Sequence, residues 1–409
     1  MNIKPELLAP AGDIKKLKTA ILYGADAVYC GGPSFSLRQG AGGLSLRELE
    51  EGCAFAHQQG KKVYLTLNAF PHNEDLPDLR RFIRSLRTLS IDAYIVADPG
   101  VMDILQEEIE KPCIHLSTQA NTVNEGTAAF YYRLGVRRIV VAREVSLQEI
   151  REIKEALPAL ELEAFVHGAM CVSYSGRCLL SSFLTGRDAN RGDCAQACRW
   201  KYFLTEEKRP GVYFPIEEDA GGTYILNAND LCMIDKLDDL MAAGVSSLKV
   251  EGRNKSEYYV AVVTAAYRRA IDAVMAGAYG EKEKKDLLRE VAKSSHRNFS
   301  TGFYYGKPTG EDQNYLSSSY VRPYQFTGLV LAYDPVRSLA LVEQRNKMER
   351  GDLLEIFGPN LAGFSYRLDR FYDAQTGEVL VSCPHPQQKI LLPSSIPLQP
   401  GSMIRKKEQ

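Results

Sequence analysis

The residues best suited to chemistry are cysteines gathered in one part of the chain. Five of the nine cysteines fall within the 62 residues from Cys171 to Cys232, at positions 171, 178, 194, 198 and 232. Thiolates at this density can ligate a metal or a cluster, or close a disulfide. His167 stands four residues before Cys171, so a thiol nucleophile with a histidine base is a further alternative. This stretch is the first candidate for a functional site.

The spacing of these cysteines differs from the common metal motifs. It reads C-x6-C at Cys171 and Cys178 and C-x3-C at Cys194 and Cys198. A zinc ribbon has two C-x2-C knuckles, and a bacterial ferredoxin has C-x2-C-x2-C. Four thiolates at one site would still suit Zn²⁺ or a [4Fe–4S] cluster. Spacing alone leaves both groups open.

The composition is that of an ordinary globular protein. The chain has 409 residues, of which 45% are hydrophobic and 25% charged, and a formal net charge of -1. The length predicts two or three domains. The N-terminus has no signal-peptide pattern and no apolar run approaches a membrane span, so we expect a cytoplasmic protein without membrane association. Thiols stay reduced in the cytoplasm, which favours ligands over a disulfide framework.

Short apolar, β-branched runs alternate with helical patterns through the first 275 residues. Eight such runs stand at 6–10, 27–32, 62–68, 93–98, 113–119, 138–144, 161–168 and 247–253. Near-continuous apolar strands between amphipathic helices predict a parallel sheet buried on both faces. Eight units predict an α/β fold of the (β/α)8 TIM-like barrel type. The rival is a doubly wound sheet, which is disfavoured because no G-x-G-x-x-G follows the first strand.

Changes in this alternating pattern predict the domain boundaries. The long interval after the seventh strand predicts a cysteine-rich insertion at 169–233, and a helix is expected over 230–244. Residues 171–202 hold five Lys/Arg against two Asp/Glu, which leaves room for a local basic patch. A charged helix is expected at 277–290 and a polar linker at 311–319. We predict a barrel domain at 1–310 and a small C-terminal all-β barrel domain at 320–409.

The carboxyl ends of the eight strands should meet at one mouth, where barrel enzymes carry their active sites. Arg143 and Arg253 stand there, and two guanidinium groups would suit a carboxylate or phosphate. The alternative is that both pair with Glu144 and Glu251 around the rim. His167 ends the seventh strand and is predicted to face the mouth as a general base or donor. The remaining polar residues at strand ends are Gly31, Gly32, Asn68, Asp98, Gln119 and Asn121.

Several longer motifs give the chain a family resemblance. They are "EAFVHGAMCVSYSGRCLLS" (163–181), "RDANRGDCAQACRWKY" (187–202), "LNANDLCMID" (226–235), "SLKVEGRNKSEYYV" (247–260) and "NFSTGFYYG" (298–306). Together with the opening "ELLAPAGD", this combination resembles peptidase family U32 over nearly the whole chain. The family's name records a collagenase-like peptidase activity. Other members are oxygen-independent hydroxylation proteins that act on ubiquinone precursors, on tRNA or on ribosomal RNA.

The chain is most similar to the tRNA branch, which makes 5-hydroxyuridine at the wobble position and draws on prephenate. Several members carry a [4Fe–4S] cluster on four cysteines. The resemblance implies Cys171, Cys178, Cys194 and Cys232 as the ligands, with Cys198 as the spare cysteine and zinc as the alternative metal.

The resemblance also suggests roles around the cluster. Arg143 and Arg253 would hold a small dicarboxylate such as prephenate, with Glu251 in the same catalytic group, and His167 would assist proton transfer. The expected partner is the anticodon region of tRNA, contacted through Trp200 and Tyr202, and a paralogous U32 chain is a second candidate partner. The alternatives are a peptidase, although no H-E-x-x-H or G-x-S-x-G is present, or a hydroxylation subunit for another RNA or aromatic substrate.

Overall fold

The computed structural model describes residues 4–37, 43–171, 173–174, 177–200, 218–219, 222–223, 228–308 and 320–408. Its first part is a closed parallel barrel, which confirms the predicted fold class. The eight barrel strands are β1 (Glu6–Ala11), β2 (Ala27–Gly31), β3 (Lys62–Leu67), β4 (Ala93–Val96), β5 (Ile114–Leu116), β6 (Arg138–Val140), β7 (Glu161–Ala169) and β11 (Ser247–Val250). Each pairs in parallel with its neighbour, and β11 pairs with both β7 and β1, which closes the sheet.

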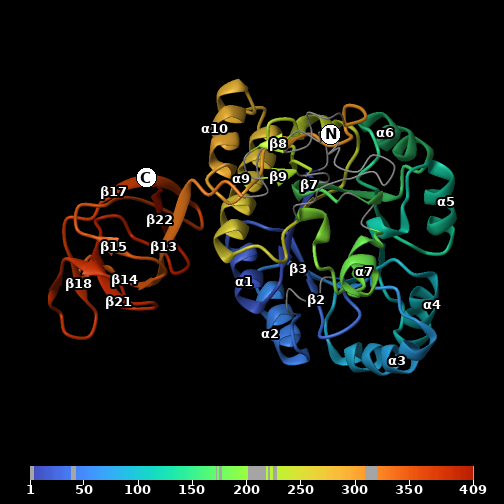
Figure 1. Cartoon of the computed structure of the whole chain (residues 1–409), viewed down its shortest axis with the longest axis horizontal. Coiled ribbons are helices and arrows are strands. Elements are labelled where there is room, and N and C mark those ends of the chain that lie inside the picture. Colours follow the sequence, from blue (N-terminus) through green and yellow to red (C-terminus); the bar gives the residue numbers. More distant parts are fainter. Residues whose placement is uncertain are drawn as a thin grey trace, which may run out of the picture.

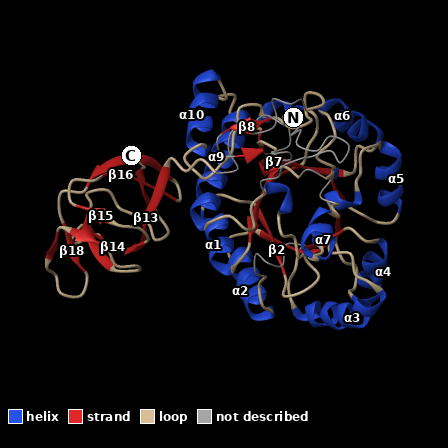
Figure 2. Ribbon diagram, viewed as in Figure 1, coloured by secondary structure: helices blue, strands red, loops and turns tan. Residues whose placement is uncertain are grey.

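Helices surround the barrel, as the ring of ribbons in Figure 2 shows. They are α1 (Ile14–Leu22), α2 (Leu46–His57), α3 (Leu76–Ser85), α4 (Pro99–Glu108), α5 (Glu125–Arg133), α6 (Leu147–Ala156), α8 (Leu237–Ala242), α9 (Glu257–Met275) and α10 (Glu281–Val291). Their apolar faces join the outward side chains of the strands in one continuous core. No helix in the described ranges is long and apolar enough to cross a membrane.

The ends of these helices are encoded locally. Ser45 and Ser146 each form a capping box with the glutamate three residues later, which fixes where α2 and α6 begin. Gly24 and Gly60 follow α1 and α2 with φ of +104° and +66°, a backbone region that glycine enters without a steric penalty. The chain can therefore turn directly from each helix into the next strand.

The predicted helix over 230–244 is wrong in its first part. Asp230–Cys232 forms a short strand, β10, that pairs antiparallel with the end of β7 and in parallel with β12 (Phe299–Ser300). The reason is that β7 runs beyond the barrel to Ala169 and offers a free edge there. Helix α8 occupies only Leu237–Ala242. The insertion itself contains α7 (Leu180–Thr185) and two short strands that pair antiparallel, β8 (Glu218–Asp219) and β9 (Gly222–Thr223).

The C-terminal part is antiparallel and all-β, as expected, and lies beside α1, α9 and α10 in Figure 1. Its main sheet follows the order β17-β16-β22-β13-β14-β21-β18-β19. The strands are β13 (Tyr324–Asp334), β14 (Leu339–Gln344), β15 (Met348–Glu349), β16 (Leu353–Gly358), β17 (Leu361–Arg367), β18 (Phe371–Asp373), β19 (Val379–Leu380), β20 (Ser382–Cys383), β21 (Lys389–Pro393) and β22 (Met403–Lys407). The predicted linker 311–319 lies outside the described residues.

The two parts share a packed interface. Tyr23 and Tyr258 of the barrel helices contact Phe357 and Met403 in one buried apolar cluster. Beside it, the fully buried Arg405 donates to Glu355 at 2.6 Å and pairs with Glu290 of α10 at 2.7 Å. A buried guanidinium needs such carboxylate partners because its desolvation is otherwise costly. The interface is therefore specific as well as apolar.

Candidate active site

A cavity of about 140 Å³ lies at the carboxyl end of the barrel, the end where barrel enzymes carry their active sites. Side chains from six strands form its wall: Tyr29, Thr66, Ile95, Val140, Phe165 and Lys249. Its other side is formed by the flap, which we define as the described residues of 171–200. The flap contributes Cys171, Ser173, Cys178, Ala189, Cys194 and Cys198. In Figure 2, α7 of the flap lies over the barrel opening.

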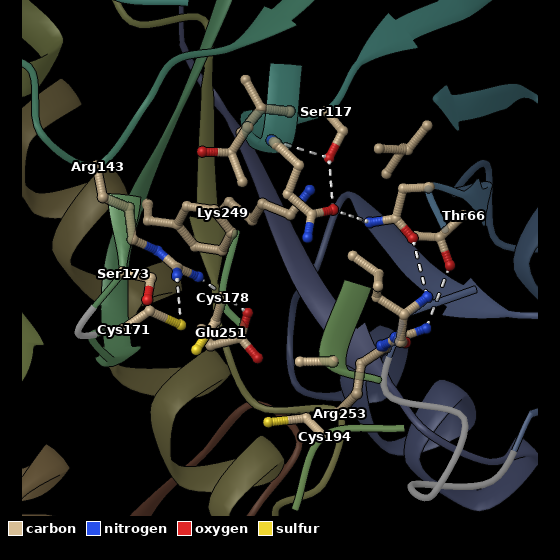
Figure 3. A pocket seen from close by; sticks show the side chains of 18 of the residues that line it. Thr66, Ser117, Arg143, Cys171, Ser173, Cys178, Cys194, Lys249, Glu251 and Arg253 are labelled. Carbon is tan, nitrogen blue, oxygen red and sulfur yellow. Dashed lines mark hydrogen bonds and ion pairs between the residues drawn. The ribbon is translucent and has the colours of Figure 1, made fainter. Parts of the chain in front are cut away.

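Arg143 connects the barrel wall to the flap (Figure 3). Its Nη2 lies 3.3 Å from Glu251 Oε2, and its Nη1 lies 3.7 Å from Cys171 Sγ. The guanidinium also stacks 4.0 Å from the centre of the Phe165 ring. All three contacts hold the planar group in one orientation. The predicted rim pair of Arg143 is thus made with Glu251 from the neighbouring part of the barrel.

Lys249 brings a second cation to the cavity. Its Nζ donates to Glu163 Oε1 at 2.7 Å, and Glu163 is also contacted by Arg138 Nη1 at 3.3 Å. Glu163 is completely buried, which raises the pKa of its carboxyl, but Lys249 and Arg138 outweigh this effect and hold that pKa below its usual range. This ionised chain inside the barrel places an ammonium group at the cavity floor.

Arg253 is the third cation that lines the cavity. Its Nη1 donates to Ser36 Oγ at 2.7 Å and to Thr66 Oγ1 at 3.2 Å, and its Nη2 donates to the Leu37 carbonyl. Arg253 is 5% exposed, so its side chain is held almost entirely by protein groups. Arg143, Lys249 and Arg253 face one cavity in which Glu251 is the lining carboxylate, so the local charge favours an anionic ligand.

Two amides complete the wall. Leu37 N–H donates to Asn68 Oδ1 at 3.2 Å, and Asn68 Nδ2 donates to Gln119 Oε1 at 3.1 Å. Of the other polar residues predicted at strand ends, Asp98 caps α4 by accepting from the N–H groups of Gly100 and Val101. It is therefore a structural cap rather than part of the cavity.

The structure brings four cysteines to the cavity: Cys171, Cys178, Cys194 and Cys198. Two of their sulfurs accept backbone hydrogen bonds, from Leu180 N to Cys178 Sγ and from Gln196 N to Cys194 Sγ, each at 3.3 Å. N–H···S bonds stabilise thiolates and tune the potential of iron–sulfur clusters. The donor set therefore has the chemistry that a thiophilic metal group requires.

These sulfurs share a cavity without being gathered at coordination distance. Within the described ranges, no three His, Cys, Asp or Glu side chains lie close enough together to hold a metal ion. Thiolate chemistry and backbone donors fit an iron–sulfur cluster, and the flap would have to draw its cysteines inward to hold one.

Cys232 lies apart from the other predicted ligands. It is on β10, where it pairs with His167, and it does not line the cavity. Its thiol is almost fully buried beside Tyr267 and the Ile234 N–H. Burial raises the pKa of this thiol to about 12, against the lowering effect of the Ile234 N–H. Cys198, the cysteine that the resemblance left as the spare, lines the cavity, whereas Cys232 does not.

His167 does not face the mouth, contrary to the prediction. The pairing of β7 with β11 runs from Phe165↔Lys249 to His167↔Val250, so Val166 is an extra residue in a β-bulge. The bulge reverses the alternation, and the His167 ring turns outward against Tyr259, Tyr267 and Phe299. Burial lowers the pKa of His167 to about 3. This position excludes the imidazole from the cavity, since it is absent from the lining and 1% exposed.

Gly168 allows the end of β7 to approach the backbone of Glu251 closely. Its φ is +112°, and a Cβ at this position would lie 2.6 Å from the Glu251 carbonyl oxygen. Only glycine permits both the backbone conformation and the close approach. The glycine thereby sets the distance between the end of β7, which leads to Cys171, and Glu251.

Lys249, Phe165 and Glu163 were not singled out from the sequence. The signal was present, because a lysine inside the apolar strand "SLKV" must be buried and therefore paired. Its partner Glu163 stands in the equally apolar strand "ELEAFV". A buried lysine and a buried glutamate in neighbouring strands of a barrel predict an ion pair in the barrel interior.

Comparison with known proteins gives matches along nearly the entire chain. The sequence profile of "Peptidase family U32" matches residues 12–314, and that of "Peptidase family U32 C-terminal domain" matches residues 322–405. The "tRNA hydroxylation protein P1" of Bacillus subtilis is 39% identical over 404 residues, which cover 98% of this chain and 95% of that protein. The "tRNA hydroxylation protein P" of Escherichia coli is 37% identical, covering 95% and 94%.

A relative with a different name also matches. The "Collagenase" of Porphyromonas gingivalis is 30% identical over 419 residues, which cover 99% of this chain and 98% of that protein. Both activities named among these relatives therefore occur on chains of the same extent. The barrel with its cysteine-bearing flap and the following all-β part both match, and the chain belongs to peptidase family U32.

Proposed function

We propose that this chain hydroxylates RNA without molecular oxygen, converting the wobble uridine of tRNA to 5-hydroxyuridine with a [4Fe–4S] cluster and prephenate. The observation that carries the proposal is the cavity, in which cysteines of the flap meet three cations of the barrel. A redox reaction on an anionic co-substrate uses both features, the thiolates as cluster ligands and the cations to hold the acid. The two relatives named tRNA hydroxylation proteins, at 39% and 37% identity, supply the reaction class.

Cys171, Cys178 and Cys194 are the proposed cluster ligands that the family resemblance and the cavity have in common. The fourth ligand is either Cys232, which the resemblance implies, or Cys198, which lines the cavity. A bound cluster of this type supplies one-electron transfer. The N–H groups of Leu180 and Gln196 would stabilise the thiolates of Cys178 and Cys194, and Arg143 would lie beside that of Cys171.

Prephenate is the proposed co-substrate because it carries two carboxylates. Arg143 and Lys249 already balance carboxylates of the protein, at distances of 3.3 Å and 2.7 Å. A ligand carboxylate would share these cations in the same low-dielectric cavity, where charge-assisted hydrogen bonds are strong. Glu251 keeps Arg143 pointing at the cavity and is proposed to act as a positioning residue.

The flap is the proposed contact for RNA. Tyr174, Phe183 and Trp200 are exposed there, and Phe183 is 82% exposed. Exposed aromatic rings can stack on unpaired bases, which is how single-stranded loops such as an anticodon are held. Tyr202, predicted for the same role, lies outside the described residues. A base taken out of its stack would reach the cavity past these rings.

Proteolysis has less support from this geometry. A thiol protease needs a histidine beside the nucleophilic sulfur. In the described structure Cys171 Sγ lies next to Arg143, and His167 is turned into the core. Gelatin hydrolysis by the anaerobically purified chain, abolished by one substitution in the cavity, would restore this alternative.

Modified nucleosides in a strain that lacks the gene test the proposal. Mass spectrometry should show loss of 5-hydroxyuridine from tRNA, with restoration by the wild-type chain and by Cys113→Ser, whose cysteine lies away from the cavity. Cys171→Ser should not restore it. Unchanged 5-hydroxyuridine, with loss of a hydroxylated base from ribosomal RNA instead, would assign another RNA as substrate. Activity of the purified chain alone would contradict the need for a paralogous partner.

A further inference from the structure

The hydrogen bonds of Asn68 and Gln119 indicate which ligand atom fits the cavity, which the positive charges alone do not. Asn68 follows β3, and Gln119 lies in the 3-10 turn Thr118–Ala120 after β5. Both residues line the cavity, and Gln119 is only 7% exposed. A buried amide normally satisfies its donors and its acceptor within the protein. The hydrogen bonds of the Gln119 amide therefore determine whether its oxygen or its NH2 group faces the cavity.

The chain of hydrogen bonds fixes the orientation of both amides. A backbone N–H can only donate, so the atom of Asn68 that meets Leu37 N at 3.2 Å is the oxygen. Asn68 then directs its NH2 group at Gln119, and the acceptor at 3.1 Å is Gln119 Oε1. Ser117 Oγ lies 3.5 Å from the same oxygen. The orientation of Gln119 is thus dictated from Leu37 and does not depend on a ligand.

The opposite side of the Gln119 amide is its NH2 group. In the part of the chain that the structure describes, none of the Gln119 hydrogen bonds uses Nε2; they use Oε1 and the backbone N–H. Since Gln119 lines the cavity and is more than nine-tenths buried, this donor is available to a ligand there. Arg143, Lys249 and Arg253 are also donors without acceptor capacity.

We propose that Gln119 is a specificity-determining residue, which requires an oxygen acceptor on the ligand, and that Asn68 is the residue that positions it. The ligand class is a small organic acid whose carboxylate or keto oxygen lies against Gln119 Nε2. An amide or amino group in the same place would set donor against donor. This inference rests on the proposed function only in taking prephenate as the natural acid.

The backbone of Leu37 links this relay to the cation site. Its N–H donates to Asn68 Oδ1, and its carbonyl accepts from Arg253 Nη2. The relay of the two amides and the Arg253 side chain are therefore anchored on the two successive peptide groups of one residue. A substitution that turns the Asn68 amide is expected to alter selectivity while leaving Arg253 and its contacts to Ser36 and Thr66 in place.

Two substitutions test whether the NH2 donor of Gln119, and not only the packing of its side chain, determines ligand binding. Gln119→Glu keeps the shape and replaces the donor by a carboxylate, so acids should bind at least about tenfold more weakly at pH 8, the loss expected when a hydrogen bond to a charged group is removed. Asn68→Asp offers two acceptors, so Gln119 should turn its NH2 group toward position 68 and its oxygen into the cavity.

The experiment is calorimetry on the purified full-length chain with prephenate, malonate and malonamate, in which one carboxylate of malonate is replaced by an amide. The wild type should prefer malonate, and Asn68→Asp should shift the malonate-to-malonamate affinity ratio toward the amide by about tenfold. A packing defect would weaken both ligands equally. Gln59→Glu, at an exposed position in the turn after α2, is the matched charge control.

The outcomes separate the two proposals. An affinity ratio that is the same in the wild type, Gln119→Glu and Asn68→Asp overturns the role of Gln119, even when prephenate binds. Binding of malonate but not prephenate overturns the co-substrate and supports the donor site. A wild-type chain that binds neither acid overturns both.

Discussion

The barrel side and the flap side of the cavity hold their residues in different ways. On the barrel side, Lys249 and Arg143 lie on or directly after strands, are buried, and each have a carboxylate partner within 3.3 Å. On the flap side, Cys178 and Cys194 lie in loops, and Cys194 is exposed. Their sulfurs are held by single backbone N–H groups.

This difference shows that buried ion pairs fix the side chains of the barrel, whereas the flap cysteines have fewer contacts. Ion pairs inside a closed sheet cannot rearrange without leaving charges unpaired, which is costly. Metal binding commonly completes sites whose ligands lie in loops. Substitutions on the barrel side should therefore act by leaving a buried charge unpaired. Substitutions on the flap side should act by loss of the proposed cluster.

The largest effect is expected on the flap. Cys171→Ser, Cys178→Ser and Cys194→Ser should each remove nearly all cluster iron and abolish hydroxylation, because each removes one of the four thiolates proposed to hold the [4Fe–4S] cluster. Iron and sulfide analysis with absorbance near 400 nm in the anaerobic protein measures this loss. Full iron in any of the three variants would contradict the ligand assignment.

The same measurement identifies the fourth ligand. Cys198→Ser and Cys232→Ser form a matched pair, one in the cavity and one on β10. One of the two should behave like Cys171→Ser, and the other should keep its iron. If Cys232→Ser loses the cluster, then cluster binding must pull Cys232 away from Tyr267 and the Ile234 N–H, so the end of β10 rearranges.

The next largest effect is expected in the stability of the barrel. Glu163→Gln leaves Lys249 and Arg138 without their shared buried carboxylate and should destabilise the barrel by about 3–5 kcal/mol. Glu161→Gln is the matched control, since Glu161 contacts the same Arg138 at 2.7 Å but its side chain is 51% exposed. That change should cost less than about 1 kcal/mol. Equal urea midpoints for the two variants would show that the barrel charges are not preorganised.

A smaller effect is expected when one cation is removed from the cavity. Arg143→Gln should reduce kcat/KM for prephenate by about 100-fold, because a buried charge-assisted contact is lost while the fold remains. Arg143→Lys keeps the charge but loses the planar fork, so its activity should fall between that of the wild type and that of Arg143→Gln. Arg137→Gln, at an exposed position six residues earlier, should leave kinetics unchanged. Wild-type kinetics in Arg143→Gln would remove this residue from the site.

The sequence predicted the barrel because each strand is a β-branched apolar run followed by an amphipathic helix, and these signals are local. It also predicted that Arg143 and Arg253 share a mouth, since all parallel strands end on one side. For the C-terminal part the sequence predicted an all-β domain but did not predict every strand, and β15, β17, β18 and β21 were missed. Only tertiary contacts show them to be strands, as when β21 pairs with β14 inside the sheet.

The orientation of His167 was beyond sequence reasoning for a different reason. Strict alternation from Glu163 and Phe165 would place it in the cavity. One extra residue, Val166, reverses that alternation, and a bulge has no reliable local pattern. The Val166 carbonyl accepts from Tyr267 on α9 and from Met233 N after β10, so the bulge depends on elements that come later in the chain.

The smallest effect concerns His167, and it distinguishes a core residue from a catalytic one. His167→Gln should change kcat/KM by less than about threefold, because the ring packs outward against Tyr259, Tyr267 and Phe299. A loss of 100-fold or more in a folded variant would show that the imidazole reaches the cavity after all. The change should instead appear in the pH dependence of stability.

Burial lowers the pKa of His167 to about 3 in the folded chain, below the value of about 6.5 in the unfolded chain. The unfolded state therefore binds the proton first, so this contribution to stability is present above pH 6.5 and is lost as the pH falls toward 3. Between pH 7 and pH 5 the loss should be about 2 kcal/mol. His115, whose pKa burial also lowers to about 3, makes the same contribution. Urea titrations should show the dependence on pH reduced by about half in His167→Gln, since His115 remains; an unchanged slope would mean that His167 is already hydrated in the folded protein.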